Sequence, residues 1–486
     1  MIADVGLQPV ITLDPSHLTE IAARGVPVPS YDRGLLEARI VHIGVGGFHR
    51  AHFALYCDDL ALAGGDWGIV GLGLLPQDAD MAEALRGQGY LYTLIEKGNG
   101  EPSARLIGSI VGFVHAPGRD DPAAAQLIAS PTTAVLSLTV TEAGYSEPSR
   151  DGAPPTFDRI ASALEVRRAQ GGGPLTILSF DNMPGNGNAA RQATLSAAAR
   201  LDAKLAAWVE SNCTFPNSMV DRITPVTAEE DREWLVESTG IDDRWPVVAE
   251  PFRQWVVEDR FAAGRPPWET VGALFTDRVH DWELYKLRML NAGHSCMAYL
   301  SALAGITFVD EAMAVPTIKT FLEELLYREA MPTLAAIPGY PREDYIVSVL
   351  ERFENGGVRD QIARLCIDGS AKFPTFLIPT IVRELEMNGP VERAATALAG
   401  WARYLGVVDP AEQSYDTAGE VARRHGAAAL ADPLAFLEYS AVFPRGLARS
   451  ERFRAAFADS YRCIADRGPI VAMEGATGAE RAGGAL

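Results

Sequence analysis

Cysteine is scarce in this chain of 486 residues, and the five that occur (Cys57, Cys213, Cys296, Cys366 and Cys463) form no CxxC pair and no regular spacing. A disulfide framework is therefore excluded as the basis of the fold, and free thiols in a reducing compartment are expected. The chain also lacks an apolar run long enough to span a membrane and a basic N-terminal region followed by a long apolar stretch. We therefore predict a cytoplasmic protein without a membrane segment.

Positive charge is also in short supply. Lys and Arg number 43 against 63 Asp and Glu, which leaves a formal net charge of −20. Nucleic acids and anionic membranes bind to basic surfaces, so neither is an expected partner, whereas small neutral substrates are compatible with this charge. The hydrophobic share of 48% and the charged share of 22% are typical of a soluble globular protein. The length exceeds that of one simple core and predicts two domains.

The element pattern divides the chain into two parts. Residues 38–50 combine a buried β-branched strand with a Gly-rich turn, and a helix is expected through residues 51–60. Further strands are expected at residues 67–75, 134–140, 175–180 and 219–222, with helices at residues 157–169 and 188–212. After about residue 280 helical patterns dominate, at residues 282–304, 317–330, 344–353, 378–386 and 390–405.

Strands that alternate with helices predict a mostly parallel, doubly wound sheet. The predicted fold is therefore α/β, with a Rossmann-type dinucleotide-binding domain over residues 1–280 and a mostly α-helical substrate domain over residues 281–486. Residues 1–37 are interpreted as a lead-in. The last fifteen residues, rich in Gly, Ala and Glu, are expected to be a loose tail.

The Gly-rich turn predicts a dinucleotide site. Two glycines let the backbone turn tightly beside a pyrophosphate, and the following helix offers free N–H groups. The motif is degenerate, because the third small position falls near Arg50-Ala51, and a purely structural turn is the alternative. The candidate cofactor-binding residues here are Gly44, Gly46, Gly47, Phe48, His49 and Arg50.

The choice between NAD and NADP is predicted from the residues beyond the second strand. A carboxylate there accepts a hydrogen bond from the ribose 2′-hydroxyl and repels a 2′-phosphate. Asp78 is the candidate, and no basic residue lies between Trp67 and Met81. NAD is thus expected, with NADP less favoured. Thr141 follows the strand at residues 134–140 and is a candidate contact for the ribose or nicotinamide, or merely part of a glycine turn.

Residues 286–295, Lys-Leu-Arg-Met-Leu-Asn-Ala-Gly-His-Ser, bring an amine, an amide and an imidazole together in an apolar setting. On an ideal α-helix Lys286, Glu283, His294 and Asn291 stand at about 0°, 60°, 80° and 140° around the axis, which places them on one face. Burial would lower the pKa of the lysine and suit it to act as a general base. The alternative is an ordinary helix with a satisfied core histidine.

A catalytic metal is not expected. His49 and His52 stand three residues apart, but no nearby cysteine or carboxylate cluster completes a zinc site. The chain also lacks the Tyr-x-x-x-Lys pair that serves as the base of short-chain dehydrogenases. A lysine base is therefore the simplest hypothesis.

Five motifs in one order give the chain a family resemblance. It resembles the polyol-specific long-chain dehydrogenases, and the likeness runs from Tyr31 to about Phe457. The Lys-x4-Asn-x2-His signature is specific when it follows the Gly-rich turn by some 240 residues. The segments that carry the resemblance are Gly44–His52, Thr139–Tyr145, Asp181–Gly187, Glu250–Trp255 and Lys286–His294.

The resemblance implies a role for each matching residue. It implies that Lys286 is the general base, that Asn182 and Asn291 hold the reacting oxygen, and that His294 orients the substrate. Glu283 is similar to the acidic residue on the proton path to the lysine. Asp221, Arg364 and Lys372 are similar to the polyol-binding set. Family members work without a catalytic metal.

The implied reaction is the NAD-dependent interconversion of D-mannitol and D-fructose. Fructuronate or tagaturonate reductases and D-arabinitol dehydrogenases of the same family stay open as alternatives, and Arg364 with Lys372 could bind a uronate carboxylate. A non-catalytic dinucleotide sensor is the alternative from another class. The resemblance also favours a monomer.

Overall fold

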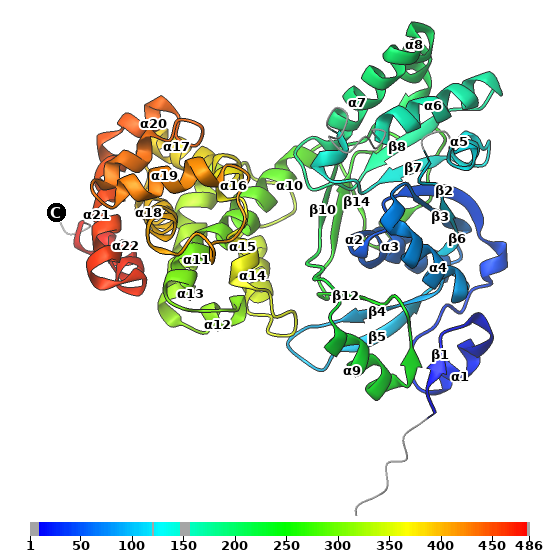
Figure 1. Cartoon of the computed structure of the whole chain (residues 1–486), viewed down its shortest axis with the longest axis horizontal. Coiled ribbons are helices and arrows are strands. Elements are labelled where there is room, and N and C mark those ends of the chain that lie inside the picture. The colour runs from blue at the N-terminus through cyan, green and yellow to red at the C-terminus, as the bar shows by residue number, and fades with distance from the viewer. Residues whose placement is uncertain (1–8, 119–120, 146–155, 484–486) are drawn as a thin grey trace, which may run out of the picture. The chain divides into compact units, whose positions relative to one another are not determined.

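The computed structural model describes residues 9–118, 121–145 and 156–483 of the chain. It contains two compact units, residues 1–280 and residues 281–486, which are coloured blue to green and green to red in Figure 1. The first unit is built on a parallel sheet and the second is almost entirely helical. The predicted fold class is thus confirmed. In the described part of the chain no helix is both long and apolar enough to cross a membrane.

The main sheet of the first unit has the order β6-β3-β2-β7-β8-β9, and every neighbouring pair is parallel. This is the doubly wound order, in which the chain starts in the middle, builds one half outward and then crosses to build the other. The two halves meet between β2 and β7. The strands are β2 (Glu37–Ile43), β3 (Trp67–Gly73), β6 (Ile110–His115), β7 (Val135–Leu138), β8 (Leu175–Ser179) and β9 (Cys213–Thr214).

Both faces of this sheet are covered. Successive side chains of a strand point to opposite faces, so Ile40 belongs to one hydrophobic core whereas Val41 and Ile43 belong to another. The first core is completed by α3 and α4, and the second by α5 to α8, which lie beside β7 and β8 in Figure 1. Because both faces are covered, β3, β7 and β8 are buried at every residue.

The three helices predicted for the first unit are present, two of them interrupted, whereas α1, α4, α5 and α9 were not predicted. The expected helix after the Gly-rich turn is broken at His52, and the expected helix at residues 188–212 is broken at Asp202, whose side chain accepts the Lys204 amide and caps a new helix. The helices are α1 (Leu18–Ala23), α2 (Gly47–Ala51), α3 (Phe53–Leu62), α4 (Ala79–Gly87), α5 (Pro122–Ala129), α6 (Thr156–Ala169), α7 (Asn186–Leu201), α8 (Ala203–Asn212) and α9 (Glu229–Thr239).

Three small sheets complete the first unit. The strand expected at residues 219–222 forms here as β10, which pairs antiparallel with β13 instead of extending the main sheet. The lead-in is also part of the fold, because β1 pairs with β11. The small sheets are β1-β11 (Ile11–Thr12, Ile241–Asp242), β12-β4-β5 (Val247–Ala249, Tyr92–Glu96, Ser103–Ile107) and β10-β13-β14 (Ser218–Asp221, Gln254–Val257, Leu274–Phe275).

The second unit is organised around α18. Twelve residues of this helix are buried, because α11, α19 and α21 pack around it. The helices are α10 (Val279–Tyr285), α11 (Ala292–Leu303), α12 (Val309–Met313), α13 (Pro316–Glu324), α14 (Arg342–Phe353), α15 (Ile362–Leu365), α16 (Gly369–Phe376), α17 (Ile378–Met387), α18 (Glu392–Val407), α19 (Gly419–Ala429), α20 (Arg445–Arg449), α21 (Glu451–Arg467) and α22 (Pro469–Gly483).

The prediction of a loose C-terminal tail is wrong for residues 472–483, which belong to α22. Ala472, Met473 and Ala476 are buried and recur at helical spacing, so one face of α22 packs against α13 and α21. Residues 484–486 lie outside the described part of the chain.

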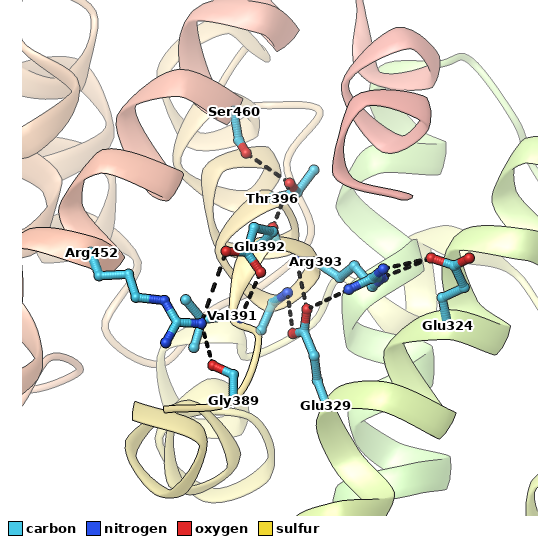
Figure 2. Close-up of polar contacts among 10 residues, drawn as sticks. Glu324, Glu329, Gly389, Val391, Glu392, Arg393, Thr396, Arg452 and Ser460 are labelled. Carbon is cyan, nitrogen blue, oxygen red and sulfur yellow. Dashed lines mark hydrogen bonds and ion pairs between the residues drawn. The ribbon is translucent and has the colours of Figure 1, made fainter. Parts of the chain in front are cut away.

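A buried carboxylate joins α18 to the segment that follows α13. The two oxygens of Glu329 accept the backbone amides of Arg393 and Ala394, both at 2.9 Å, and so cap the N-terminus of α18 (Figure 2). The Arg393 guanidinium pairs with Glu324 at 2.6 Å and reaches Glu329 at 3.4 Å. Burial raises the pKa of Glu329 to about 7, against the effect of these amide donors.

Candidate active site

The turn after β2 lies at the point where the two halves of the main sheet meet, which is where doubly wound sheets bind their ligands. Gly44 has a φ of +88°, and a Cβ there would overlap the carbonyl of Thr139 at the end of β7. The Thr139 hydroxyl donates to the Gly44 carbonyl at 2.6 Å. Glycine is therefore required at residue 44 by both conformation and space.

Gly46 differs from Gly44, because it has ordinary backbone angles and a Cβ there would make only an ordinary contact, with the Gly44 carbonyl at 3.8 Å. It precedes Gly47, the first residue of α2, whose opening amides have no acceptor within the helix. The arrangement leaves room for a group to approach the backbone closely. This is the property that the sequence predicted for a dinucleotide turn.

The polar side chains of α2 point into the protein. His49 is fully buried, and its ring stacks on that of His42 at 3.5 Å. Arg50 is 4% exposed, donates to the Trp245 carbonyl at 2.5 Å and lies over the ring of Tyr92. Burial lowers the pKa of His42 to about 3, so its ring is neutral. His49 is thus enclosed within the protein, whereas Arg50 also lines the pocket beside this turn.

A pocket of about 350 Å³ borders this turn within the first unit. Gly47, Phe48 and Arg50 line one wall, and the opposite wall comes from residues 224–227 and 245–247 with Arg232. Its charged lining residues are Arg50 and Arg232, so an anionic group would meet positive charge here. The Nε of Arg50 and the hydroxyl of Thr224 are buried without a hydrogen-bond partner among the described residues. These features fit a phosphate-bearing cofactor.

Asp78 lies beyond the carboxyl end of β3, as expected from the sequence. It is half-buried, and its Oδ2 accepts the Leu75 amide at 2.9 Å. The hydrogen bond holds the carboxylate at the edge of the sheet, one strand away from the glycine turn. This is where the ribose of a dinucleotide would be expected.

The loops after β7 and β8 meet at Asp181. Thr141 has a left-handed φ of +62°, and its amide donates to Asp181 Oδ1 at 2.7 Å. The Tyr145 hydroxyl donates to Asp181 Oδ2 at 2.7 Å. Burial raises the pKa of Asp181, whereas these donors lower it. The carboxylate thus ties together two loops at the same edge of the sheet.

Asn182 is exposed and occupies the centre of a tight turn, in which the Met183 amide donates to the Asp181 carbonyl at 2.9 Å. Asn186 secures the end of this loop, because its amide nitrogen donates to the carbonyls of Asp181 and Ser218. Ser218 begins β10, and β10 ends at Asp221, which is 3% exposed. Asn182 and Asp221 therefore belong to segments that hydrogen bonds hold together.

The Lys286 segment is helical but not regular. Residues Lys286–Asn291 form a π-helical turn between α10 and α11. The predicted angles for an ideal α-helix are wrong here, because the i to i+5 hydrogen bonds add a residue to the turn and shift the positions that follow. Such turns are rare and occur often at functional sites.

The candidate catalytic residues of the second unit lie along this segment. Lys286, 9% exposed, opens the π-helical turn and Asn291 closes it, while Glu283, 6% exposed, precedes the turn in α10. His294 follows in α11, and its ring stacks on Phe353 of α14 at 4.0 Å. The predicted burial of the lysine is confirmed.

Arg364 and Lys372 lie close together in the second unit. The Lys372 ammonium donates to the Leu365 carbonyl at 3.1 Å, and its pKa is lowered by burial and then by the charge of Arg364. Arg364 is more exposed and forms an ion pair with Asp360. This pair could bind a hydroxyl-rich or carboxylate-bearing substrate.

Sequence reasoning missed Asp181 and Asn186, although both stand within a motif that it used. The sequence signal for Asp181 was its position as an acidic residue directly after the strand predicted at residues 175–180, where side chains reach the ligand-binding edge of the sheet. Among the described residues, no three His, Cys, Asp or Glu side chains are grouped so that they could hold a metal ion.

Two family models cover most of the chain. One, described as the mannitol dehydrogenase Rossmann domain, matches residues 38–270. The other, described as the mannitol dehydrogenase C-terminal domain, matches residues 278–465. The two matches lie in the sheet-containing and helical units respectively.

Individual relatives match over nearly the full length. Mannitol dehydrogenase 2 of Saccharomyces cerevisiae is 39% identical over 475 residues, covering 92% of this chain and 94% of the relative. The structure of Pseudomonas fluorescens mannitol 2-dehydrogenase in a ternary complex with NAD and D-mannitol is 38% identical, with a TM-score of 0.83, and covers 96% of this chain and 99% of that one. A D-sorbitol dehydrogenase in substrate-free form is 33% identical, with a TM-score of 0.87, over 95% and 100% of the two chains.

Proposed function

The chain belongs to the mannitol dehydrogenase family and is a polyol dehydrogenase, and on that premise we propose that it interconverts D-mannitol and D-fructose with NAD. The observation that carries the proposal is the match in both units to an enzyme whose solved complex holds NAD and D-mannitol. The glycine turn, Asp78 and the Lys286 segment support it from within this chain.

Conversion of a secondary alcohol to a ketone needs the loss of a hydroxyl proton and of a hydride from the same carbon. We assign Lys286, which is 9% exposed, as the base that accepts the proton. Asn182 and Asn291 are the amide donors to the oxygen as negative charge develops on it. We assign Glu283 to the proton path. We assign His294, whose ring stacks on Phe353, to orientation of the substrate.

The cofactor would be held by the first unit. The opening amides of α2 and the positive wall of the neighbouring pocket suit a pyrophosphate, and Thr141 lies at the end of β7 for contact with the ribose or nicotinamide. Bound NAD would supply the acceptor for the hydride. Asp78 at the end of β3 favours NAD over NADP, because its charge repels a 2′-phosphate.

A substrate panel tests this proposal. Oxidation of NADH and of NADPH is followed with D-fructose, D-xylulose, fructuronate and tagaturonate, each with and without EDTA. We expect fast oxidation of NADH with D-fructose that EDTA does not slow. Activity confined to the uronates would instead assign Arg364 and Lys372 to a carboxylate. NADH binding without turnover of any substrate would indicate a dinucleotide sensor.

The likeness to a D-sorbitol dehydrogenase favours a second candidate, oxidation of D-sorbitol. D-Mannitol and D-sorbitol differ only in configuration at C2, and oxidation of either at this carbon gives D-fructose. The identity of the polyol formed from NADH and D-fructose therefore separates the two. D-Mannitol as the product supports the first candidate, and D-sorbitol supports the second.

A further inference from the structure

Asp181 is the polar centre of the two loops that follow β7 and β8. The residue is 5% exposed, and its carboxylate accepts the Thr141 amide and the Tyr145 hydroxyl at 2.7 Å each. The Ser179 hydroxyl also reaches the carboxylate, at 3.4 Å. In the described part of the chain the hydrogen-bond donors to this carboxylate are amides and hydroxyls of the two loops.

The backbone of the same residue fixes Asn182. The Asp181 carbonyl accepts the Met183 amide at 2.9 Å and the Asn186 side chain at 3.1 Å. Asn182 lies between Asp181 and Met183, so the first of these bonds closes a turn around it. Asp181 thus restrains Thr141 through its side chain and Asn182 through its main chain. The first of these residues has the proposed cofactor role, and the second has the proposed role at the reacting oxygen.

We propose that Asp181 is a positioning residue of the reaction, which holds the Thr141 turn and the Asn182 turn in one frame. The inference rests on the proposed roles of Thr141 and Asn182. Without the carboxylate, the Thr141 amide loses its acceptor, and the left-handed backbone at Thr141 keeps only the bond from the Gly144 amide to the Thr141 carbonyl, at 3.0 Å, among the contacts of the described residues. Displacement of a catalytic group by about 1 Å can slow a reaction by about 100-fold, even when binding is retained.

The test compares two substitutions at this position. Asp181→Ala removes both acceptor oxygens, and we expect kcat for D-mannitol oxidation to fall by about 100-fold. Asp181→Asn keeps one acceptor for Thr141, and its amide can donate to Tyr145 if that hydroxyl turns to Ser179, 2.6 Å away. We expect about a tenfold loss of kcat, because the neutral group accepts more weakly than a carboxylate. The Kd for NADH should change by only a few-fold.

Asp58 provides a control. It is a fully buried carboxylate of the same unit that accepts a tyrosine hydroxyl, from Tyr31, and a backbone amide, from Gly108. Unlike Asp181, it also forms an ion pair with Arg105, at 2.6 Å. Asp58 lies in α3, and its partners Tyr31, Arg105 and Gly108 lie outside the loops after β7 and β8. Asp58→Asn should lower the thermal midpoint without lowering kcat of the folded enzyme.

The deciding readout is the primary isotope effect on kcat with D-mannitol deuterated at both C2 and C5, which are equivalent positions in this symmetric polyol. Both Asp181 variants keep the main-chain bonds of residue 181 but weaken or remove its side-chain bonds to Thr141 and Tyr145, so residue 181 can shift and carry Asn182 with it. This shift slows the chemical step, so the isotope effect should rise in the Asp181 variants and stay unchanged in Asp58→Asn. Unchanged kcat and isotope effect in Asp181→Asn overturn the proposal, even if Asp181→Ala does not fold. Failure of the proposed function would show differently, as a wild-type protein that turns over none of the polyols.

Discussion

At the scale of single residues, the charge of Asp78 decides the expected cofactor preference. The Oδ2 of this side chain is held by the Leu75 amide, so Asp78→Asn retains an acceptor for that bond while removing the charge. We expect the ratio of kcat/KM for NADH to that for NADPH to fall by about tenfold or more, since repulsion of the 2′-phosphate disappears. Initial rates with the two cofactors measure this ratio.

Asp80, exposed in α4 two residues further on, is the control for a general loss of negative charge. Asp80→Asn should leave the ratio unchanged. If Asp78→Asn also leaves it unchanged, the assignment of Asp78 to the ribose is wrong.

Substitution of the two glycines of this turn is expected to have different effects, on cofactor binding at Gly46 and on stability at Gly44. Gly46→Ala fits the chain as it stands, because its Cβ would meet only the Gly44 carbonyl, at 3.8 Å, so the free energy of unfolding should change by no more than about 0.5 kcal/mol. A Cβ there would nevertheless obstruct a pyrophosphate, and the Kd for NADH should rise at least tenfold. Calorimetry and quenching of protein fluorescence measure the two effects. Binding of NADH as in the wild type would show that the turn is structural only.

Gly44→Ala should instead destabilise the protein by about 2 kcal/mol or more, through backbone strain and overlap with the Thr139 carbonyl. Gly64 isolates the two causes, since its φ of +94° is also left-handed but its Cβ position is open. Gly64→Ala should cost about 1 kcal/mol. Equal costs at the two positions would contradict the overlap with Thr139.

At the scale of elements, the junction of α17 and α18 carries a pH dependence of stability. Glu384 is 1% exposed, and its Oε1 has no hydrogen-bond partner in the described part of the chain. Burial, and then the charge of Glu329, raise its pKa from 4.5 to about 7. The unfolded chain therefore releases this proton at lower pH than the folded protein, and stability should fall as the pH rises from about 4.5 through 7.

Glu384→Gln should remove this contribution, which is on the order of 1–3 kcal/mol. Urea unfolding between pH 5 and 8 measures the effect as a flatter dependence than in the wild type. Glu386→Gln, on the exposed side of the same helix, is the control and should leave the curve unchanged. A wild-type curve that rises over this range in parallel with that of Glu384→Gln would contradict the raised pKa.

An element could be predicted where its own sequence determines it, and could not where distant parts of the chain determine it. Strands β3, β7 and β8 are buried at every residue and β2 over its last four, so each shows in the sequence as a short apolar run. The edge strand β9 has two residues, and the residues of β10 formed a strand in a different sheet, because a strand sequence does not specify its partner. The helix α22 was not predicted because its buried face is formed largely by alanines in a Gly- and Ala-rich segment, which gives a weak apolar pattern.

The candidate site follows the same rule. Glycines of the turn and the Lys286 segment are contiguous and could be recognised. The π-helical turn could not, because it is a change of hydrogen-bond register that leaves no mark on composition. The role of Asp181 depends on Thr141 and Tyr145, forty and thirty-six residues away, so only the folded chain reveals it.

At the scale of the whole molecule, a net charge of −20 and a cofactor that carries phosphates would repel each other over the protein surface at large. The pocket beside the glycine turn differs locally, because its charged lining residues are Arg50 and Arg232. Selective binding of the dinucleotide therefore depends on this small region of the first unit rather than on the overall charge.

The central claim is that this polyol dehydrogenase uses Lys286 as its base and needs no metal. The most direct measurement is kcat for D-mannitol oxidation with NAD in the presence of EDTA, for the wild type and for Lys286→Ala. We expect wild-type turnover and a loss of at least about 1,000-fold in the variant, with NADH binding retained. Equal rates for the two proteins, or a wild-type rate abolished by EDTA, would contradict the claim.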